Sequence, residues 1–367
     1  MDRKYDQLML KQLQTNQTIK TEFKHNYVYK NLPGVTEDGV LDPYLYKQLK
    51  IPMTVASFLP KRKWNLEKMI GVLRKGFDEV KSIPITATDT EIIKRTIIHD
   101  NTEIPINIYI PVTIDHNQKY PVMFFIHGGG FVAGSTNVVE QAVKLLCETY
   151  PCVAVSIDYR LAPENPFPAG HDDCYNALKW IYENIEFYYG NKEKIFIAGD
   201  SAGGNIALYC SLKSKDENLS MIKAQVLYYP VVNLSGISDE YNIYKKENYY
   251  VQRKYRKTVF GVIDLAGQDL GLTMAKALGQ PNSNSVYLSP YFADMTNLAP
   301  TILIYGEYDF LYTDCRGFAK KLDIANVPNK TIVYKGMQHA FLDYVGILAQ
   351  AEDSVGEVIS FIKQYLS

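Results

Sequence analysis

Ser201 lies at the centre of the segment Gly-Asp-Ser-Ala-Gly at residues 199–203, after the apolar run 195–198 and before a stretch compatible with a helix. This pattern predicts a strand, a sharp turn and a helix, with the serine at the apex. The two glycines allow so tight a turn because they carry no side chain. The Ser201 hydroxyl would then project above the edge of a sheet as a nucleophile, and the backbone N–H of Ala202 would point to a developing oxyanion.

A glycine-rich phosphate loop is the main alternative for this segment. A P-loop requires Lys-Ser/Thr after its glycines, and a dinucleotide-binding loop requires the spacing Gly-x-Gly-x-x-Gly. The segment has neither pattern. Since a serine hydroxyl is a weak nucleophile until a base removes its proton, the interpretation depends on a histidine and an acid elsewhere in the chain.

A histidine and a carboxylate each follow an apolar run. His339 comes shortly after the run 331–334, and Asp309 follows the run 301–305 in the same way. The carboxyl end of a strand is the expected place for a general base, and the acid is expected between serine and histidine in chain order. Glu307 is the competing carboxylate. Buried beside the imidazole, Asp309 would fix its tautomer, so these two residues and the serine are predicted to form a catalytic triad.

A second glycine-rich loop follows the apolar run 122–126. It consists of His127 and three consecutive glycines, a composition that lets backbone N–H groups approach a bound carbonyl. The N–H groups of Gly128 and Gly129, with that of Ala202, are predicted to form an oxyanion hole. We expect His127 to shape the loop through hydrogen bonds rather than to transfer protons.

The elements that must position these residues begin at about residue 91. Isoleucines alternate with other residues over 104–110, which is typical of a half-buried strand. Continuous apolar runs, typical of strands buried on both faces, then alternate with helical segments. This alternation predicts an α/β fold with a mostly parallel sheet flanked by helices. The runs are 122–126, 153–157, 195–198, 224–229, 301–305 and 331–334.

Two regions do not follow this alternation of apolar runs and helical segments. Residues 1–90 are predicted to be mostly helical, with an amphipathic helix at 64–73, and to form an N-terminal cap segment. The interval 229–301 is far longer than a usual crossover, and an insertion at about 232–286, with a helix at 259–278, is expected to cover the site. We therefore expect a catalytic domain at 91–367 that carries this cap insertion.

Composition excludes several classes of function. The 367 residues carry a formal net charge of −1 and show no basic stripe, which argues against a nucleic-acid partner. No apolar run approaches the ~20 residues of a membrane span, and the polar N-terminus has no signal-peptide pattern. Five scattered cysteines without Cys-x-x-Cys spacing indicate reduced thiols in a cytoplasmic protein.

Three long motifs together resemble the hormone-sensitive-lipase family of α/β-hydrolases, also called bacterial family IV esterases. They are His-Gly-Gly-Gly-Phe at 127–131, Tyr-Arg-Leu-Ala-Pro-Glu-Asn-Pro-Phe-Pro-Ala at 159–169 and Gly-Asp-Ser-Ala-Gly-Gly-Asn at 199–205. The resemblance extends from about residue 90 to the C-terminus. It implies an eight-stranded α/β-hydrolase sheet under a helical cap, with Ser201, Asp309 and His339 as the triad and Gly128, Gly129 and Ala202 as the oxyanion hole.

The resemblance implies a serine carboxylesterase that needs no metal or organic cofactor. Its substrate would be a small ester, similar to an acetyl ester, and the protein would be a monomer or a homodimer. An amidase or deacetylase of a small metabolite is an alternative, as is a non-catalytic receptor on the same scaffold. The chain departs from the family pattern at 309–313, Asp-Phe-Leu-Tyr-Thr in place of Asp-Pro-Leu-Arg-Asp, and at Ala340, where glycine is usual.

Overall fold

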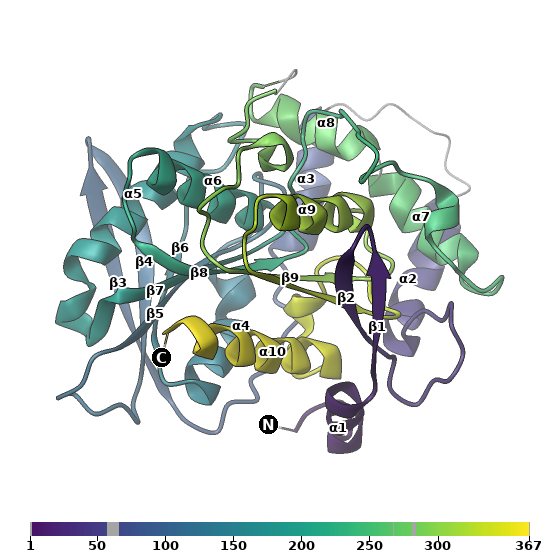
Figure 1. The fold of residues 1–367 in the computed structure, drawn as a ribbon, viewed down its shortest axis with the longest axis horizontal. Coiled ribbons are helices and arrows are strands. Elements are labelled where there is room, and N and C mark those ends of the chain that lie inside the picture. Colours follow the sequence, from purple (N-terminus) through teal and green to yellow (C-terminus); the bar gives the residue numbers. More distant parts are fainter. Residues whose placement is uncertain (1, 57–65, 267, 281–283, 367) are drawn as a thin grey trace.

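The computed structural model describes residues 2–56, 66–266, 268–280 and 284–366. Within them a ten-stranded sheet has the order β1-β2-β10-β9-β8-β7-β5-β6-β4-β3 (Figure 1). Its strands are β1 (Gln17–Glu22), β2 (His25–Lys30), β3 (Thr90–His99), β4 (Thr102–Pro111), β5 (Tyr120–Ile126), β6 (Val153–Ile157), β7 (Gly190–Asp200), β8 (Ile222–Tyr228), β9 (Thr301–Gly306) and β10 (Asn329–Tyr334).

The eight strands β3 to β10 confirm the predicted α/β-hydrolase sheet. Strand β4 runs antiparallel to both of its neighbours, and the other pairings among these eight are parallel. The continuous apolar runs are buried as expected, since all five residues of β6 and all six of β9 are inaccessible to solvent. The alternating isoleucines of β4 also face the core.

Helices cover both faces of the sheet. Figure 1 shows α5, α6 and α9 on one side and α4 and α10 on the other. Their bounds are α4 (Thr136–Thr149), α5 (Ala169–Asn184), α6 (Ala202–Asp216), α9 (Tyr312–Ile324) and α10 (Ala349–Leu366). These helices follow the predicted alternation of apolar runs with helical segments, and their buried residues pack on the sheet.

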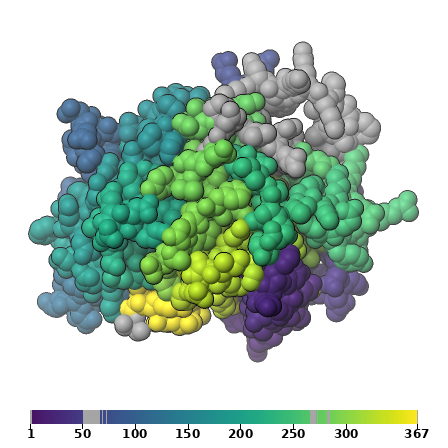
Figure 2. Space-filling view, turned by 45° about the horizontal axis from the view of Figure 1, so that its top comes forward, coloured from purple at the N-terminus to yellow at the C-terminus, as the bar shows by residue number. Residues whose placement is uncertain are grey.

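The first thirty residues do not have the structure predicted for a helical cap segment at 1–90, because they contain two strands. Strands β1 and β2 form a hairpin, and β2 pairs in parallel with β10 through residues 27–30 and 331–334. The hairpin therefore extends the sheet to ten strands, and α1 (Gln7–Thr15) packs against α10 below it. Figure 2 shows this N-terminal hairpin in purple beside the yellow-green segment that includes β10.

Four helices gather at one end of the molecule, at the upper right of Figure 1. They are α2 (Pro43–Ala56), α3 (Leu66–Phe77), α7 (Arg256–Ala266) and α8 (Gln268–Ala277). Helix α2 packs against α7, so the early segment and the later insertion are in contact. The predicted helix at 259–278 is two helices. The predicted helix at 64–73 corresponds to α3, and its first two residues lie outside the described residues.

The structure also bears on the cysteines and on membrane-spanning segments. The five cysteines are buried as free thiols. Among the helices of the described residues, none combines the length and the hydrophobicity that crossing a membrane requires.

Candidate active site

The predicted turn at Ser201 joins the end of β7 to the start of α6. Ser201 has φ 53° and ψ −117°, an uncommon backbone conformation for a residue with a side chain. The turn is tight because Gly203 packs directly on β5. A Cβ atom at this position would lie 2.1 Å from the carbonyl oxygen of Ile126. The sequence thus provides the close approach that lifts the serine above the sheet.

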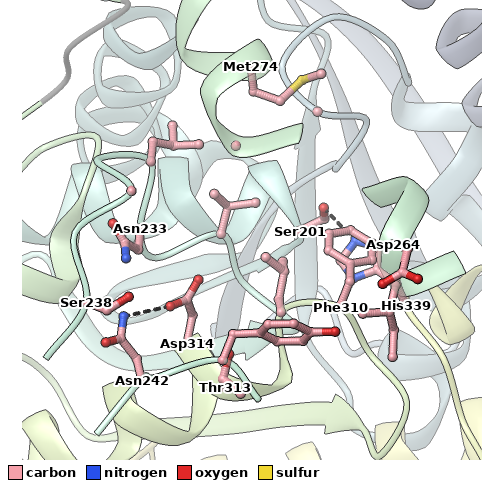
Figure 3. A pocket seen from close by; sticks show the side chains of 18 of the residues that line it. Ser201, Asn233, Ser238, Asn242, Asp264, Met274, Phe310, Thr313, Asp314 and His339 are labelled. Carbon is pink, nitrogen blue, oxygen red and sulfur yellow. Dashed lines mark hydrogen bonds between the residues drawn. The ribbon is translucent and has the colours of Figure 1, made fainter. Parts of the chain in front are cut away.

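The structure brings the three predicted catalytic residues together. Nε2 of His339 lies 2.9 Å from Oγ of Ser201, and Nδ1 lies 2.9 Å and 3.0 Å from the two carboxylate oxygens of Asp309 (Figure 3 shows the histidine and the serine). Asp309 is completely buried, and its Oδ1 also accepts the backbone N–H of Leu311 at 2.8 Å. The arrangement is that of a hydroxyl, a base and a carboxylate linked in series.

The competing carboxylate, Glu307, lies away from the imidazole. Its Oε2 accepts the backbone N–H of Gly336 at 3.1 Å, which supports the turn after β10. Burial raises the pKa of Glu307 to about 7. Asp309 is therefore the acid that contacts His339, as the sequence predicted.

The ring of His339 is held between aromatic residues. The ring of Phe310 lies 4.4 Å from it and that of Tyr229 lies 4.7 Å away, measured between centroids. These contacts fix the imidazole plane so that both nitrogens keep their partners. Phe310 stands where the family pattern has proline, so the departure supplies a packing surface rather than removing a functional group.

The predicted oxyanion hole needs one correction. The N–H of Gly128 donates to Oδ1 of Asp200 at 2.8 Å, so it is not free for a substrate oxygen. Within the described part of the chain, the N–H groups of Gly129, Gly130 and Ala202 have no acceptor. Gly130 also lines the same pocket as Ser201. The sequence alone could not distinguish Gly130 from Gly128, because a run of three glycines does not reveal which amide is already bonded.

The residue beside the nucleophile, Asp200, therefore fixes the glycine loop. Burial raises its pKa to about 7, with a further contribution from the nearby Asp343 carboxyl, whereas the Gly128 N–H and His339 act in the opposite direction. His127 helps to shape the same loop. Its Nδ1 lies 2.7 Å from the carbonyl oxygen of Gly128, and its ring stacks on Tyr159. Burial lowers the pKa of His127, which keeps the imidazole neutral and suits a structural role.

A pocket of about 510 Å³ opens at Ser201 and His339. This volume lies within the usual range for small-molecule sites. The pocket is bounded by residues from α3, from α7 and α8, and from the loop that precedes α9. No group of three or more metal-ligating side chains that could hold an ion occurs among the residues that the structure describes.

Known proteins resemble this chain over most of its length. A family model described as the alpha/beta hydrolase fold matches residues 123–343. An arylesterase of Saccharolobus solfataricus is 33% identical over 264 residues, which cover 72% of this chain and 81% of that protein. Carboxylesterase NlhH of Mycobacterium tuberculosis is 29% identical over 300 residues, 81% of this chain and 90% of the relative. The solved structure of a Pyrobaculum calidifontis esterase has a TM-score of 0.70 at 29% identity, over 89% of this chain and all of that one.

Proposed function

Because this chain belongs to the α/β-hydrolase fold family, we propose that it is a serine carboxylesterase acting on small esters with short acyl chains. These esterase relatives support the resemblance to the hormone-sensitive-lipase family. The observation that carries the proposal is the unbroken contact from Ser201 through His339 to the buried Asp309. The relatives named as carboxylesterase and arylesterase support the same reaction class.

The reaction follows from this geometry. Ser201 Oγ attacks the ester carbonyl carbon while Nε2 of His339 takes its proton. The carbonyl oxygen, now negatively charged, accepts hydrogen bonds from the N–H groups of Gly129, Gly130 and Ala202. The alcohol leaves with the proton from His339, which produces an acyl-serine. Water then attacks the acyl group with the same base, and the acid is released.

Each donor of the oxyanion hole contributes about 3 kcal/mol to lowering the barrier, since it is positioned before charge develops. Asp309 keeps the proton of the imidazole on Nδ1 and stabilises the imidazolium that forms. The chemistry needs no metal or organic cofactor. The buried free thiols support the proposal that the protein works in a reducing compartment such as the cytoplasm.

An amidase or deacetylase reaction would use the same residues, because an amide differs from an ester mainly in its leaving group. A non-catalytic receptor is less well supported. Such a receptor does not need a base beside the serine, and here His339 is in place and in contact with both partners.

The test is hydrolysis of p-nitrophenyl acetate by the wild-type chain and by Ser201→Ala. We expect the variant to lose about 10⁵-fold or more in kcat, because the nucleophile is removed. A parallel assay with p-nitroacetanilide separates ester from amide hydrolysis. A Ser201→Ala variant that keeps most of the wild-type rate would contradict the proposal.

A further inference from the structure

The pocket beside Ser201 has two ends of different polarity. Figure 3 shows the serine, His339, Phe310 and Asp264 on one side and a group of polar side chains on the other. The Asp264 carboxylate is already paired, because it lies 3.0 Å from Nζ of Lys246. The apolar part of the lining comes from Leu73, Phe77, Ile263, Met274, Phe310 and Leu311. The polar group consists of Asn233, Ser238, Asn242, Thr313 and Asp314. We call these five residues the polar end of the pocket.

Asp314 provides the negative charge of the polar end. It lies in the first turn of α9, and one of its carboxylate oxygens accepts Nδ2 of Asn242 at 2.8 Å. The described residues provide no basic side chain in an ion pair with it. The neighbouring Asp239 is already neutralised, because its carboxylate lies 2.7 Å from Nζ of Lys321. Asp314 therefore faces the pocket with unused hydrogen-bond acceptor capacity.

The charge state of Asp314 suits this role. Burial raises its pKa to about 6, and the amides of Asn242 and Asn233 counteract this increase. Above pH 6 the side chain is therefore mostly the carboxylate, an acceptor for two or more donors. A half-buried carboxylate without a cation is costly unless donors satisfy it, so a bound ligand with donor groups would be stabilised there.

The other members of the polar end favour hydroxyl groups over an ammonium group. Ser238 is exposed and contributes a hydroxyl that both donates and accepts, as does Thr313. Asn242 is buried, its Oδ1 accepts the N–H of Asp239 and one amide hydrogen goes to Asp314, so it offers one amide hydrogen beside the hydroxyl hydrogens of Ser238 and Thr313. An ammonium group only donates and would leave these hydrogens unpaired. A ligand with several hydroxyls satisfies donors and acceptors together.

Tyrosines of the cap contribute less to this surface than their number in the sequence suggests. Of the five between residues 241 and 255, Tyr244 lines the pocket. Its hydroxyl is buried and has no hydrogen-bond partner within the described residues. Tyr249 donates to the backbone oxygen of Asp309, and Tyr250 is 68% exposed. The recognition of polar groups at this end therefore depends on the carboxylate, amides and hydroxyls.

We propose that the polar end binds the alcohol part of a polyhydroxylated ester, such as an acylated sugar, with Asp314 as its specificity-determining residue. The inference rests on the proposed esterase function. A polyhydroxylated molecule enters an ester through one of its own oxygens, so its remaining hydroxyls belong to the alcohol. The acyl chain then occupies the apolar part of the pocket. Hydrolysis adds water across the acyl–oxygen bond, and the polyol leaves with the proton from His339.

The experiment compares two acetates of similar size. Methyl 6-O-acetyl-α-D-glucopyranoside carries three free hydroxyls on a six-membered ring, and cyclohexylmethyl acetate carries none. We expect the wild-type chain to have the higher kcat/KM for the glucoside. Asp314→Asn should lower the ratio of the two kcat/KM values by about 10- to 100-fold, the range expected for a hydrogen bond to a charged group. Ser238→Ala should lower it by about 2- to 10-fold.

Asp323→Asn is the matched control, because Asp323 lies in the last turn of the same helix and pairs with His25 instead of facing the pocket. It should leave the substrate ratio unchanged. Thermal unfolding of each variant identifies any that do not fold. If a variant does not fold, the wild-type chain is tested instead with methyl α-D-glucopyranoside as an inhibitor of p-nitrophenyl acetate hydrolysis. Competitive inhibition would support the inference, and no inhibition would oppose it.

The outcomes separate the two proposals. No hydrolysis of p-nitrophenyl acetate by the wild-type chain would overturn the esterase function itself. Hydrolysis of that ester with a preference for cyclohexylmethyl acetate, or a ratio unaffected by Asp314→Asn, would overturn the polar-end inference alone. A preference for acetylcholine over 3,3-dimethylbutyl acetate, with no preference for the glucoside over cyclohexylmethyl acetate, would show that the carboxylate selects a cation. This result would also contradict the polar-end inference.

Discussion

Replacement of Asp309 by asparagine tests how the acid acts on His339. Oδ1 of Asp309 accepts the N–H of Leu311 at 2.8 Å, and Oδ2 lies 2.9 Å from Nδ1 of the histidine. In Asp309→Asn the amide oxygen would keep the bond to Leu311, which places the amide nitrogen against Nδ1. An amide nitrogen donates, so the imidazole proton would move to Nε2. The histidine would then present a proton, rather than a lone pair, to Ser201.

The expected loss follows from this exchange of donor and acceptor. We expect kcat to fall by about 10³- to 10⁴-fold, equivalent to about 4–5.5 kcal/mol, with KM little changed. Because the Asp309 side chain is inaccessible to solvent, water is not available to replace the carboxylate. His339→Ala should cost more, because it removes the base itself.

The assay is steady-state hydrolysis of p-nitrophenyl acetate at pH 7.5. Glu307→Gln is the matched control, since this carboxylate is also buried but contacts Gly336 rather than the imidazole. Its kcat should remain within about threefold of the wild-type value, because no donor or acceptor at the reacting atoms changes. An Asp309→Asn variant within tenfold of wild type, or a larger loss in Glu307→Gln, would refute the assignment of the acid.

Two further predictions concern stability. Gly203→Ala should destabilise the fold by about 1–3 kcal/mol or more, because its Cβ would lie 2.1 Å from the oxygen of Ile126. As a control, the Cβ of Gly356→Ala meets no atom within 4 Å, so this variant should be neutral or stabilising. Urea unfolding of both variants checks this. Burial lowers the pKa of His171 to about 4, so between pH 6.5 and 4 the unfolded chain binds a proton that the folded chain does not. The stability of the wild-type chain should therefore fall by about 3 kcal/mol relative to His171→Gln over that interval, and parallel unfolding curves against pH would contradict this.

The parallel core of the sheet could be predicted from the sequence because burial on both faces requires continuous apolar runs. Strands such as β6 and β9 have this local apolar pattern in their own sequence, whichever strand lies beside them. The hairpin of β1 and β2 has no such continuous apolar run. Five of the six residues of β1 are exposed, and the buried Lys30 of β2 is compensated by acids of α10 some 320 residues later. A pairing of that kind depends on long-range contacts that no local pattern contains.

The residues of the site also differ in how well the sequence predicted them. The order of serine, acid and histidine, each after an apolar run, predicted the three residues that the fold brings together. The choice of oxyanion donors was less accurate, because the Asp200 side chain takes the Gly128 amide through a contact between two loops. The polar end of the pocket was not predicted as such. Its residues come from 233–242 and from the start of α9, and these segments meet only in the folded chain.

The most direct test of the central claim is labelling with a fluorophosphonate, followed by mass spectrometry of the digested protein. An activated serine forms a stable phosphonyl adduct, whereas an ordinary serine does not react. We expect one adduct, at Ser201, and its loss in both Ser201→Ala and His339→Ala. An unlabelled wild-type chain, or labelling that persists without the histidine, would contradict the account.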